Sequence, residues 1–301
     1  MAKHIQVFDP RQDMTRGEYE IQHKRDTYLK NVELHHHDFY ELFFLVSGDV
    51  TYAIESKLYH VMPGDMLLIS PRELHQVYVR PDMESYERYV LWLDPKLLQR
   101  LSTEDTDLGH CLDPLSPDYS NSLRLCPESR STVGSLMERI YQESEGGSFG
   151  SGMLQDSLIR YLLIELNRQA VHQGQSAEPS GVNPVVDEVV RYVNQHYGEA
   201  LPLSVLADQF HVSKYHLCHE FQRQMGSSIH RYIRKKRLQI ARQLLAEGQK
   251  PNTVFSTCGF GDYTCFYRAF VSEYGISPRD FSAAVKDSHT ERLEAFPAAT
   301  G

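Results

Sequence analysis

A pattern of two short helices around a tight turn occurs twice in the last third of this chain. The first copy runs from Pro202 to Gly226 and the second from Asn252 to Gly275. In both copies, apolar residues recur at three- and four-residue spacing, which predicts amphipathic helices, and a glycine ends the second helix. A longer basic helix, expected near Ser228 to Ala246, joins them. Paired helices of this kind enter the major groove of DNA, so the repeat predicts a DNA-binding domain.

The second helix of each copy is expected to read DNA. In the first copy, Ser213 is a suitable N-cap, and Leu217 and Phe221 lie on the buried face. In the second copy, Gly259 and Gly261 shape the turn, and Asp262 is the cap. The residues expected near bases are Tyr215, Cys218, His219, Tyr263, Thr264, Tyr267 and Arg268, and those nearer phosphates are Lys214, Arg223 and Lys236.

The joining helix sets the distance between the two reading helices. About 19 residues at ~1.5 Å each span ~28 Å. One turn of B-DNA is ~34 Å long, so helices at the two ends could enter successive major grooves. The helix carries several cations, which either form a solvated basic face or neutralise phosphates. They are Arg231, Arg234, Lys235, Lys236, Arg237 and Arg242.

Residues 183–285 resemble the DNA-binding domain of AraC-type transcription regulators. The motifs that carry the resemblance occur in the family's order: Leu206-Ala207, Ser213 to Phe221, Arg237 to Leu245, Cys258 to Phe260, Phe266 to Phe270 and Gly275 to Pro278. Phe255 departs from the small alanine that is usual there, so we expect the second reading helix to seat differently. The resemblance implies a regulator that binds double-stranded operator DNA and acts through contact with RNA polymerase.

Charge and cysteine usage agree with this interpretation. The chain has 301 residues, enough for about two domains, and a formal net charge of −9. Residues 184–285 hold 12 Lys and Arg against 9 Asp and Glu, so the positive charge lies where DNA binding needs it. Five cysteines without a CxxC pair argue against a disulfide framework. The sequence shows no signal peptide or membrane span, and a cytoplasmic location is expected.

The N-terminal half changes to short alternating segments separated by turn residues. This pattern predicts a β-sandwich or barrel. The expected strands are Tyr40–Val46, Val50–Glu55, Lys57–Val61, Asp65–Ile69, His75–Val79 and Tyr86–Leu93. The predicted fold class is therefore α+β, with a β-barrel followed by helices and then by the all-helical DNA-binding domain.

His35, His37 and Glu41 share parity, so one continuous extended run would direct them to the same face. Their HxHxxxExxxxxxG spacing, followed by His75, resembles the cupin barrel, whose metal-binding members hold a divalent metal at these four positions. Arg72 replaces a glycine that is usual in the second cupin motif. Metal ligation and a small-molecule pocket both remain open, but the expected cofactor is none.

A pocket of imidazoles, carboxylates and aromatic rings suits a polyhydroxylated ligand. By analogy with sugar-sensing relatives, Glu87 and Tyr89 join His35, His37, Glu41 and His75 as effector-binding residues. In those relatives an N-terminal arm can cover the ligand, which would here include Phe8.

Residues 129–173 return to helical periodicity, with two apolar stripes separated by Gly146-Gly147. The second stripe is wider than packing on a barrel requires, so we expect a homodimer formed by this helical pair. The expected segments are an effector-binding domain (1–128), the dimerisation segment (129–173), a flexible linker (174–183), the DNA-binding domain (184–285) and a disordered tail (286–301).

Three functions fit these patterns. The first is a transcription regulator, not an enzyme, in which a carbohydrate effector shifts the placement of two DNA-binding domains, usually as an activator. The second is a metal-dependent cupin enzyme with an accessory DNA-binding domain. The third is a constitutive DNA-binding protein whose barrel serves only for dimerisation.

Overall fold

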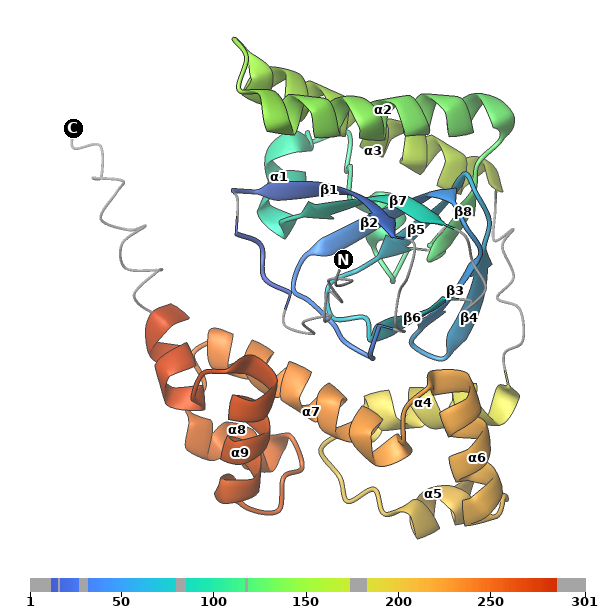
Figure 1. Ribbon diagram of the computed structural model, residues 1–301. Helices are drawn as coiled ribbons and strands as arrows, with labels where there is room; N and C mark the ends of the chain where they lie inside the picture. Colours follow the sequence, from blue (N-terminus) through green and yellow to red (C-terminus); the bar gives the residue numbers. More distant parts are fainter. Residues whose placement is uncertain are drawn as a thin grey trace, which may run out of the picture. The chain divides into compact units, whose positions relative to one another are not determined.

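The computed structural model describes residues 12–15, 17–26, 32–79, 85–116, 119–173 and 183–285 (Figure 1). Two compact units result, one before Asn183 and one that begins with it. The N-terminal arm with Phe8, linker residues 174–182 and the tail from 286 lie outside the described residues.

The first unit is built on two antiparallel sheets (Figure 1). A five-stranded sheet has the order β1-β7-β2-β5-β8, and a three-stranded sheet has the order β4-β3-β6. The strands are β1 (Tyr19–Asp26), β2 (Tyr40–Ser47), β3 (Val50–Ile54), β4 (Lys57–Val61), β5 (Asp65–Ile69), β6 (His75–Val79), β7 (Tyr86–Leu93) and β8 (Ser122–Arg124).

All six strands predicted from the alternation are present, each within one residue of its expected ends. The alternation did not reveal β1 or β8. Strand β1 pairs with β7 over its whole length, from Tyr19 opposite Leu93 to Asp26 opposite Tyr86. Its only buried residue is Ile21, so this edge strand lacks the apolar alternation by which strands are recognised.

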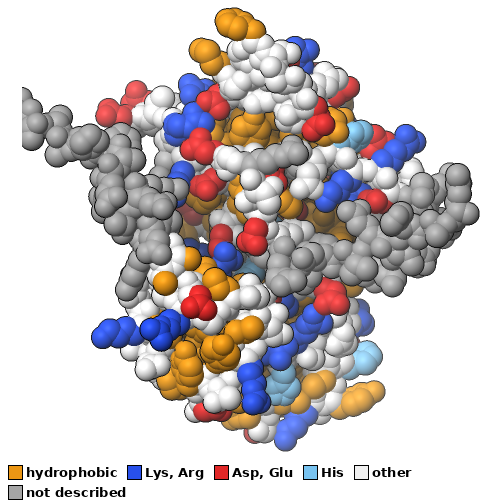
Figure 2. Space-filling view, turned by 60° about the vertical axis from the view of Figure 1, so that its left-hand side comes forward, with side chains coloured by type: hydrophobic (Ala, Val, Ile, Leu, Met, Phe, Trp, Pro, Cys, Tyr) orange, Lys and Arg blue, Asp and Glu red, His pale blue; other side chains and the backbone are white. Residues whose placement is uncertain are grey.

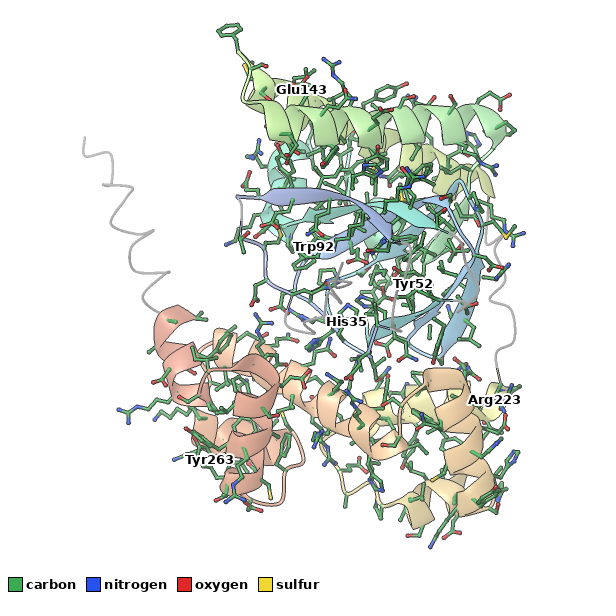
Figure 3. The ribbon with its side chains drawn as sticks, viewed as in Figure 1. His35, Tyr52, Trp92, Glu143, Arg223 and Tyr263 are labelled. Carbon is green, nitrogen blue, oxygen red and sulfur yellow. The ribbon has the colours of Figure 1, made fainter. Side chains whose placement is uncertain are left out.

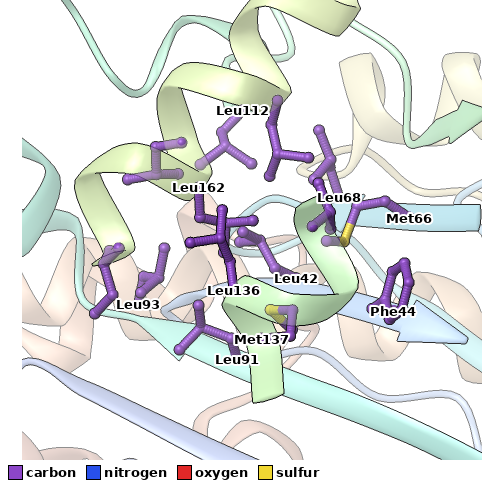
Figure 4. Packing of buried hydrophobic residues seen from close by; sticks show 14 of the residues in the cluster. Leu42, Phe44, Met66, Leu68, Leu91, Leu93, Leu112, Leu136, Met137 and Leu162 are labelled. Carbon is purple, nitrogen blue, oxygen red and sulfur yellow. The ribbon is translucent and has the colours of Figure 1, made fainter. Parts of the chain in front are cut away.

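Two cores cover the two faces of the five-stranded sheet. Phe43, Tyr86 and Trp92 belong to the core between the sheets. The neighbouring Tyr89 and Leu91 belong to the other core, which lies between the sheet and the helices (Figure 4). Strand β7 is therefore buried on both faces, and the side chains of consecutive residues point into different cores.

Helices cover the outer face of the five-stranded sheet (Figure 1). They are α1 (Pro95–Leu101), a 3₁₀ turn (His110–Leu112), α2 (Pro127–Gly146) and α3 (Ser151–Gln173). The predicted stripe of α2 faces this core with Val133, Met137 and Ile140. Gly147 ends α2 in the left-handed conformation, with φ of 61°. Within the described segments, no helix has the length and hydrophobicity needed to cross a bilayer.

The second unit is all-helical, as the repeat predicts. Its helices are α4 (Pro184–His196), α5 (Leu203–Gln209), α6 (Lys214–Met225), α7 (Ile229–Ala246), α8 (Pro251–Thr257) and α9 (Tyr263–Tyr274), and helical residues 278–285 follow. Asn183, assigned to the linker from the sequence, is the N-cap of α4 and accepts from Val185 N at 3.0 Å. Pro202 is the N-cap of α5, so the helix begins one residue after the start of the first copy.

Candidate functional site

Three backbone contacts bring the predicted histidines and Glu41 together between the two sheets. His35 forms a two-hydrogen-bond antiparallel bridge with His75, at 3.0 and 2.9 Å. Arg72 N donates to His37 O at 2.9 Å. Glu41 lies on β2, opposite Trp92 of β7. The expected continuous extended run is wrong, because the chain bends at residues 38–39 and β2 begins only at Tyr40.

The four side chains nevertheless converge, and all are at most 6% exposed. The ligand-type atoms of His37, Glu41 and His75 lie within 4.8 Å of one another. The ring of His35 is centred 4.2 Å from that of His75 and 6.2 Å from that of His37. Figure 3 marks this region through His35, Tyr52 and Trp92. We call His35, His37, Glu41 and His75 the barrel cluster.

Backbone carbonyls fix the orientation of the three rings. Nδ1 lies 2.9 Å from Glu33 O in His35, 2.8 Å from Phe39 O in His37 and 2.8 Å from Glu73 O in His75. A carbonyl oxygen only accepts, so each Nδ1 carries the proton. In a neutral ring this leaves a lone pair on Nε2. Nε2 of His37 lies 3.5 Å from Glu41 Oε2, whereas the buried Nε2 of His75 has no hydrogen-bond partner among the described residues.

Protonation in the cluster follows from burial and from the neighbouring charges. Burial lowers the pKa of His75 to about 4, with a further contribution from His37. Burial and the neighbouring rings of His75 and His37 lower the pKa of His35 as well. Burial by itself would raise the pKa of Glu41, but hydrogen bonding and charge from His37 outweigh it and lower the pKa to about 2. Near neutral pH the cluster therefore holds an ionised carboxylate on Glu41 and neutral imidazoles on His35 and His75.

Aromatic and charged residues that the sequence reasoning missed surround the cluster. Trp92 donates its indole N–H to Glu41 Oε2 at 2.9 Å. The ring of Phe39 stacks on His37 with centroids 4.1 Å apart. Arg88 lies 4.1 Å over the ring of Tyr86 and forms an ion pair with Asp26. Alternation along β7, counted from Trp92, would have identified Arg88 and Tyr86 as residues of the barrel interior.

Glu87 and Tyr89 are not part of this cluster, which corrects the sequence-based grouping. Their parity on β7 is opposite to that of Trp92, so they face the helices. Glu87 contacts His23 Nε2 at 2.8 Å, and the His23 ring stacks on Tyr89 with centroids 4.4 Å apart. His23 lines an open groove of about 650 Å³ between β1 and the α2–α3 hairpin, also lined by Tyr141.

The first predicted reading helix, α6, is capped as expected by Ser213, which accepts from His216 N at 3.1 Å. Lys214, Tyr215, Cys218 and His219 are all exposed, and Tyr215 is 81% exposed.

The remaining α6 candidate, Arg223, is exposed but bound within its own helix. Its Nη2 lies 2.6 Å from Glu220 Oε2, and His219 Nδ1 lies 3.2 Å from Glu220 Oε1. Asn183 donates to the same Glu220 at 2.8 Å. Hydrogen bonds from Arg223, Asn183 and His219 lower the pKa of Glu220 to about 2.

The second reading helix, α9, departs from the prediction at its first residue, Tyr263. Thr264, Tyr267 and Arg268 are exposed as predicted. Tyr263 was expected to point outward but is half-buried, with its ring 5.8 Å from Phe255 in an edge-to-face contact. The unusual Phe255 therefore packs against a predicted DNA-contacting side chain. Arg223 and Tyr263 are labelled in Figure 3.

The cations of α7 divide between surface and interior. Arg234 is exposed, and Lys236 is half-buried. Lys235 is 5% exposed and forms an ion pair with Glu273 of α9. Arg237 donates to backbone carbonyls, and Arg242 lies over the rings of Tyr274 and Phe281, at 5.2 and 5.5 Å. Neither a solvated basic face nor phosphate contact describes these three inward cations. Figure 2 shows Lys, Arg and His interspersed with hydrophobic side chains on the helical unit.

Two family models match the two units. The AraC-like ligand binding domain matches residues 20–163, and a helix-turn-helix domain matches residues 206–284. The chain is 27% identical to the HTH-type transcriptional regulator YbfI of Bacillus subtilis over 76% of its length and 78% of the relative's. It is 26% identical to the HTH-type transcriptional activator RhaS of Salmonella schwarzengrund, over 82% and 86% of the two lengths.

Among solved structures, ToxT from Vibrio cholerae is similar, with a TM-score of 0.37 and 11% identity over 89% of this chain and 98% of that one. The two matched domains and the named relatives define a DNA-binding transcription regulator with a ligand-binding N-terminal domain, and not an enzyme. The chain belongs to the AraC-type regulators, as its sequence motifs predicted.

Proposed function

We propose that this regulator is an activator controlled by a sugar or sugar derivative that binds at the barrel cluster. The observation that carries the proposal is the buried Nε2 acceptor of His75, which has no partner among the described residues and lies beside the ionised Glu41. Buried polar atoms without partners are rare and costly. Sugar hydroxyls donate hydrogen bonds to such acceptors, and the rings of Phe39 and Trp92 can cover the C–H faces of a sugar.

The activator role rests on the similarity to RhaS, which is named as an activator, and implies contact with RNA polymerase. Because the proposed target is operator DNA, we also propose a cytoplasmic location. The proposed operator contacts are Lys214, Tyr215, Cys218, His219 and Arg223 of α6, Lys236 of α7, and Tyr263, Thr264, Tyr267 and Arg268 of α9. Arg223 can reach a phosphate only by leaving Glu220, and Tyr263 reaches DNA with the part of its ring that Phe255 leaves uncovered.

A homodimer through the α2–α3 hairpin belongs to the same proposal. Large hydrophobic side chains remain exposed on α3, among them Met153 at 80%, Tyr161 at 47% and Val171 at 57%. Figure 2 shows hydrophobic side chains at the surface of this hairpin. A second copy would cover them. The effector then acts as a switch if it binds one arrangement of the two DNA-binding domains more tightly than the other.

A divalent metal at His37, Glu41 and His75 is a second candidate ligand. In favour of it, the three donor atoms lie within 4.8 Å, and both Nδ1 atoms donate to backbone carbonyls, as is common for metal-ligating histidines. Two imidazoles and a carboxylate suit such ions. The metal would be a ligand of the sensor and would supply a Lewis-acidic anchor for effector hydroxyls.

Thermal unfolding of the full chain with a panel of mono- and disaccharides, with and without chelator, tests both candidates. We expect one sugar class to raise the unfolding temperature and the chelator to have no effect. His37→Gln should abolish the shift, whereas Glu87→Gln, on the opposite face of the sheet, should retain it. A shift that appears with metal alone and vanishes with chelator would support the metal. No shift with any sugar or metal would contradict the proposed sensor function.

A further inference from the structure

The loop between α4 and α5, which leads into the first helix-turn-helix unit, touches the second unit at a place other than α7. The loop after α4, residues 197–199, lies against the turn that follows α8. A Cβ placed on Gly198 would lie 2.7 Å from Thr257 O, and one on Gly259 would lie 2.8 Å from Tyr197 O. Real Cβ atoms essentially never approach oxygen so closely, so the two backbones pack directly on each other. We call this place the inter-unit contact.

Arg237 of α7 closes the inter-unit contact. Its Nε donates to Tyr197 O at 2.8 Å, and its Nη2 donates to Glu199 O at 2.6 Å. The same Nη2 lies 2.9 Å from the position that a Cβ on Gly259 would take. A planar guanidinium reaches two carbonyls at once, whereas a lysine ammonium is a single point charge on a flexible stem. Arg237 of α7 thus binds the loop between α4 and α5. The same helix, α7, also packs on the core of the second helix-turn-helix unit.

A second attachment changes the mechanics of the linkage. Two units joined by one helix can twist at either end of that helix. Contact at a second place removes this freedom, and the Lys235–Glu273 ion pair further attaches α9 to α7. We infer that Gly198, Gly259 and Arg237 set the separation and relative rotation of the two reading helices. They therefore determine how many base pairs separate the two DNA segments that α6 and α9 of one chain read. We call these two segments the half-sites. Arg237 acts as a positioning residue, through backbone carbonyls and not through DNA.

Half-site spacing gives a direct test with the full-length protein. The probe is a duplex selected by the wild-type protein from random DNA, with both protected half-sites mapped. Inserting one base pair between them shifts one half-site by ~3.4 Å and rotates it by roughly 35°. We expect the wild type to lose about tenfold or more in affinity on insertion, because a fixed pair of helices cannot follow.

Two variants disrupt the inter-unit contact from opposite sides. Arg237→Lys retains the charge and loses the fork, and Gly198→Ala pushes the loop away from Thr257. Each should bind the original duplex about three- to tenfold more weakly, and each should reduce the insertion penalty to about threefold or less. A variant that only destabilised the fold would bind more weakly but would keep the full insertion penalty. A reduced penalty therefore identifies a role in positioning.

Matched controls lie close by in the same unit. Arg234→Lys changes an exposed cation of α7, and Gly261→Ala adds a methyl group where no atom of the described residues lies within 4 Å. Both should keep the wild-type insertion penalty. If Arg237→Lys or Gly198→Ala remains folded by thermal unfolding and keeps the full penalty as well, the inference is overturned. The same holds if the wild type tolerates the insertion.

Discussion

The two helix-turn-helix units share one plan and differ where they meet their neighbours. Each has a seven-residue helix, a twelve-residue helix and a glycine that ends the second helix in the left-handed conformation. Two residues after the first helix, the first unit has His211 with φ of 55° and the second has Gly259 with φ of 76°. A non-glycine residue can therefore hold this backbone conformation. Gly259 is required by a neighbour instead, because a Cβ would meet Tyr197 O.

Their reading helices differ as well. In α6, Glu220 binds Arg223 and His219, so part of the positive charge is compensated within the helix. Ala269 stands at the equivalent position of α9, so Thr264, Tyr267 and Arg268 are exposed on that helix without a carboxylate at this position. The same fold thus carries an ion pair within the reading helix in one unit and lacks the corresponding carboxylate in the other.

Exchanging the turn residues should have the largest effect. Gly259→His places a Cβ under 3 Å from two backbone oxygens, and should lower the free energy of unfolding of the helical unit by about 2 kcal/mol or more. The reverse exchange, His211→Gly, should change it by less than about 1 kcal/mol. Urea unfolding followed by circular dichroism measures both. Equal effects in the two units would remove the distinction between them.

Removing the unusual ring of the second unit should come next. Phe255→Ala deletes a half-buried ring from the core and should cost about 1–2 kcal/mol, less than a fully buried phenylalanine. Tyr263 then loses the ring beside it, so base preference under α9 should change and preference under α6 should not. Binding-site selection with the variant measures this. Phe255→Leu, which keeps most of the volume, should restore stability but not base preference.

Removing the carboxylate of the first unit should strengthen DNA binding. Glu220→Gln deletes a negative charge from the reading helix and releases Arg223. We expect affinity for random duplex DNA to rise about threefold, and the salt dependence to steepen by about 0.9 in log–log slope. Binding titrations at several salt concentrations measure both. Glu188→Gln on α4 makes the same charge change outside α6, and an identical gain there would count against a local role of Glu220.

The caps should give the smallest difference, and it depends on pH. Asp262 caps α9 and has its pKa lowered from 3.8 by hydrogen bonds from Cys265, whereas Ser213 of α6 does not titrate. A depressed carboxyl pKa stabilises the fold above pH 3.8 and loses this contribution as pH falls through the folded value. The amide NMR signal of Cys265 should therefore move on acidification while that of His216 stays. Asp262→Ser should abolish the difference.

The sequence was sufficient for the repeated helices and for most strands, because their periodicities are local. Ser213 and Asp262 were recognisable as caps for the same reason. The pairing of β1 with β7 was not predictable, since β1 has little apolar alternation and its partner lies about 65 residues away. Spacing predicted the barrel cluster, but the bend before Tyr40 and the partners of Glu41 depend on tertiary contacts.

The placement of Glu87 and Tyr89 failed because family analogy took precedence over parity. Trp92 lies on the same strand, and counting back from it in steps of two leads to Arg88 and not to either of these residues. The inward cations of α7 could not be recognised, because a basic residue bound to a carbonyl has the same sequence signature as one that faces solvent.

Those inward cations also affect how the protein searches a genome. Lys235, Arg237 and Arg242 are committed to internal partners, so they release no counterions when DNA approaches. Each phosphate contact adds about 0.9 to the salt dependence of binding, and nonspecific binding depends almost entirely on this term. We therefore expect weaker retention on random DNA than twelve basic residues suggest. Short nonspecific encounters would leave discrimination to the side chains at the two reading helices.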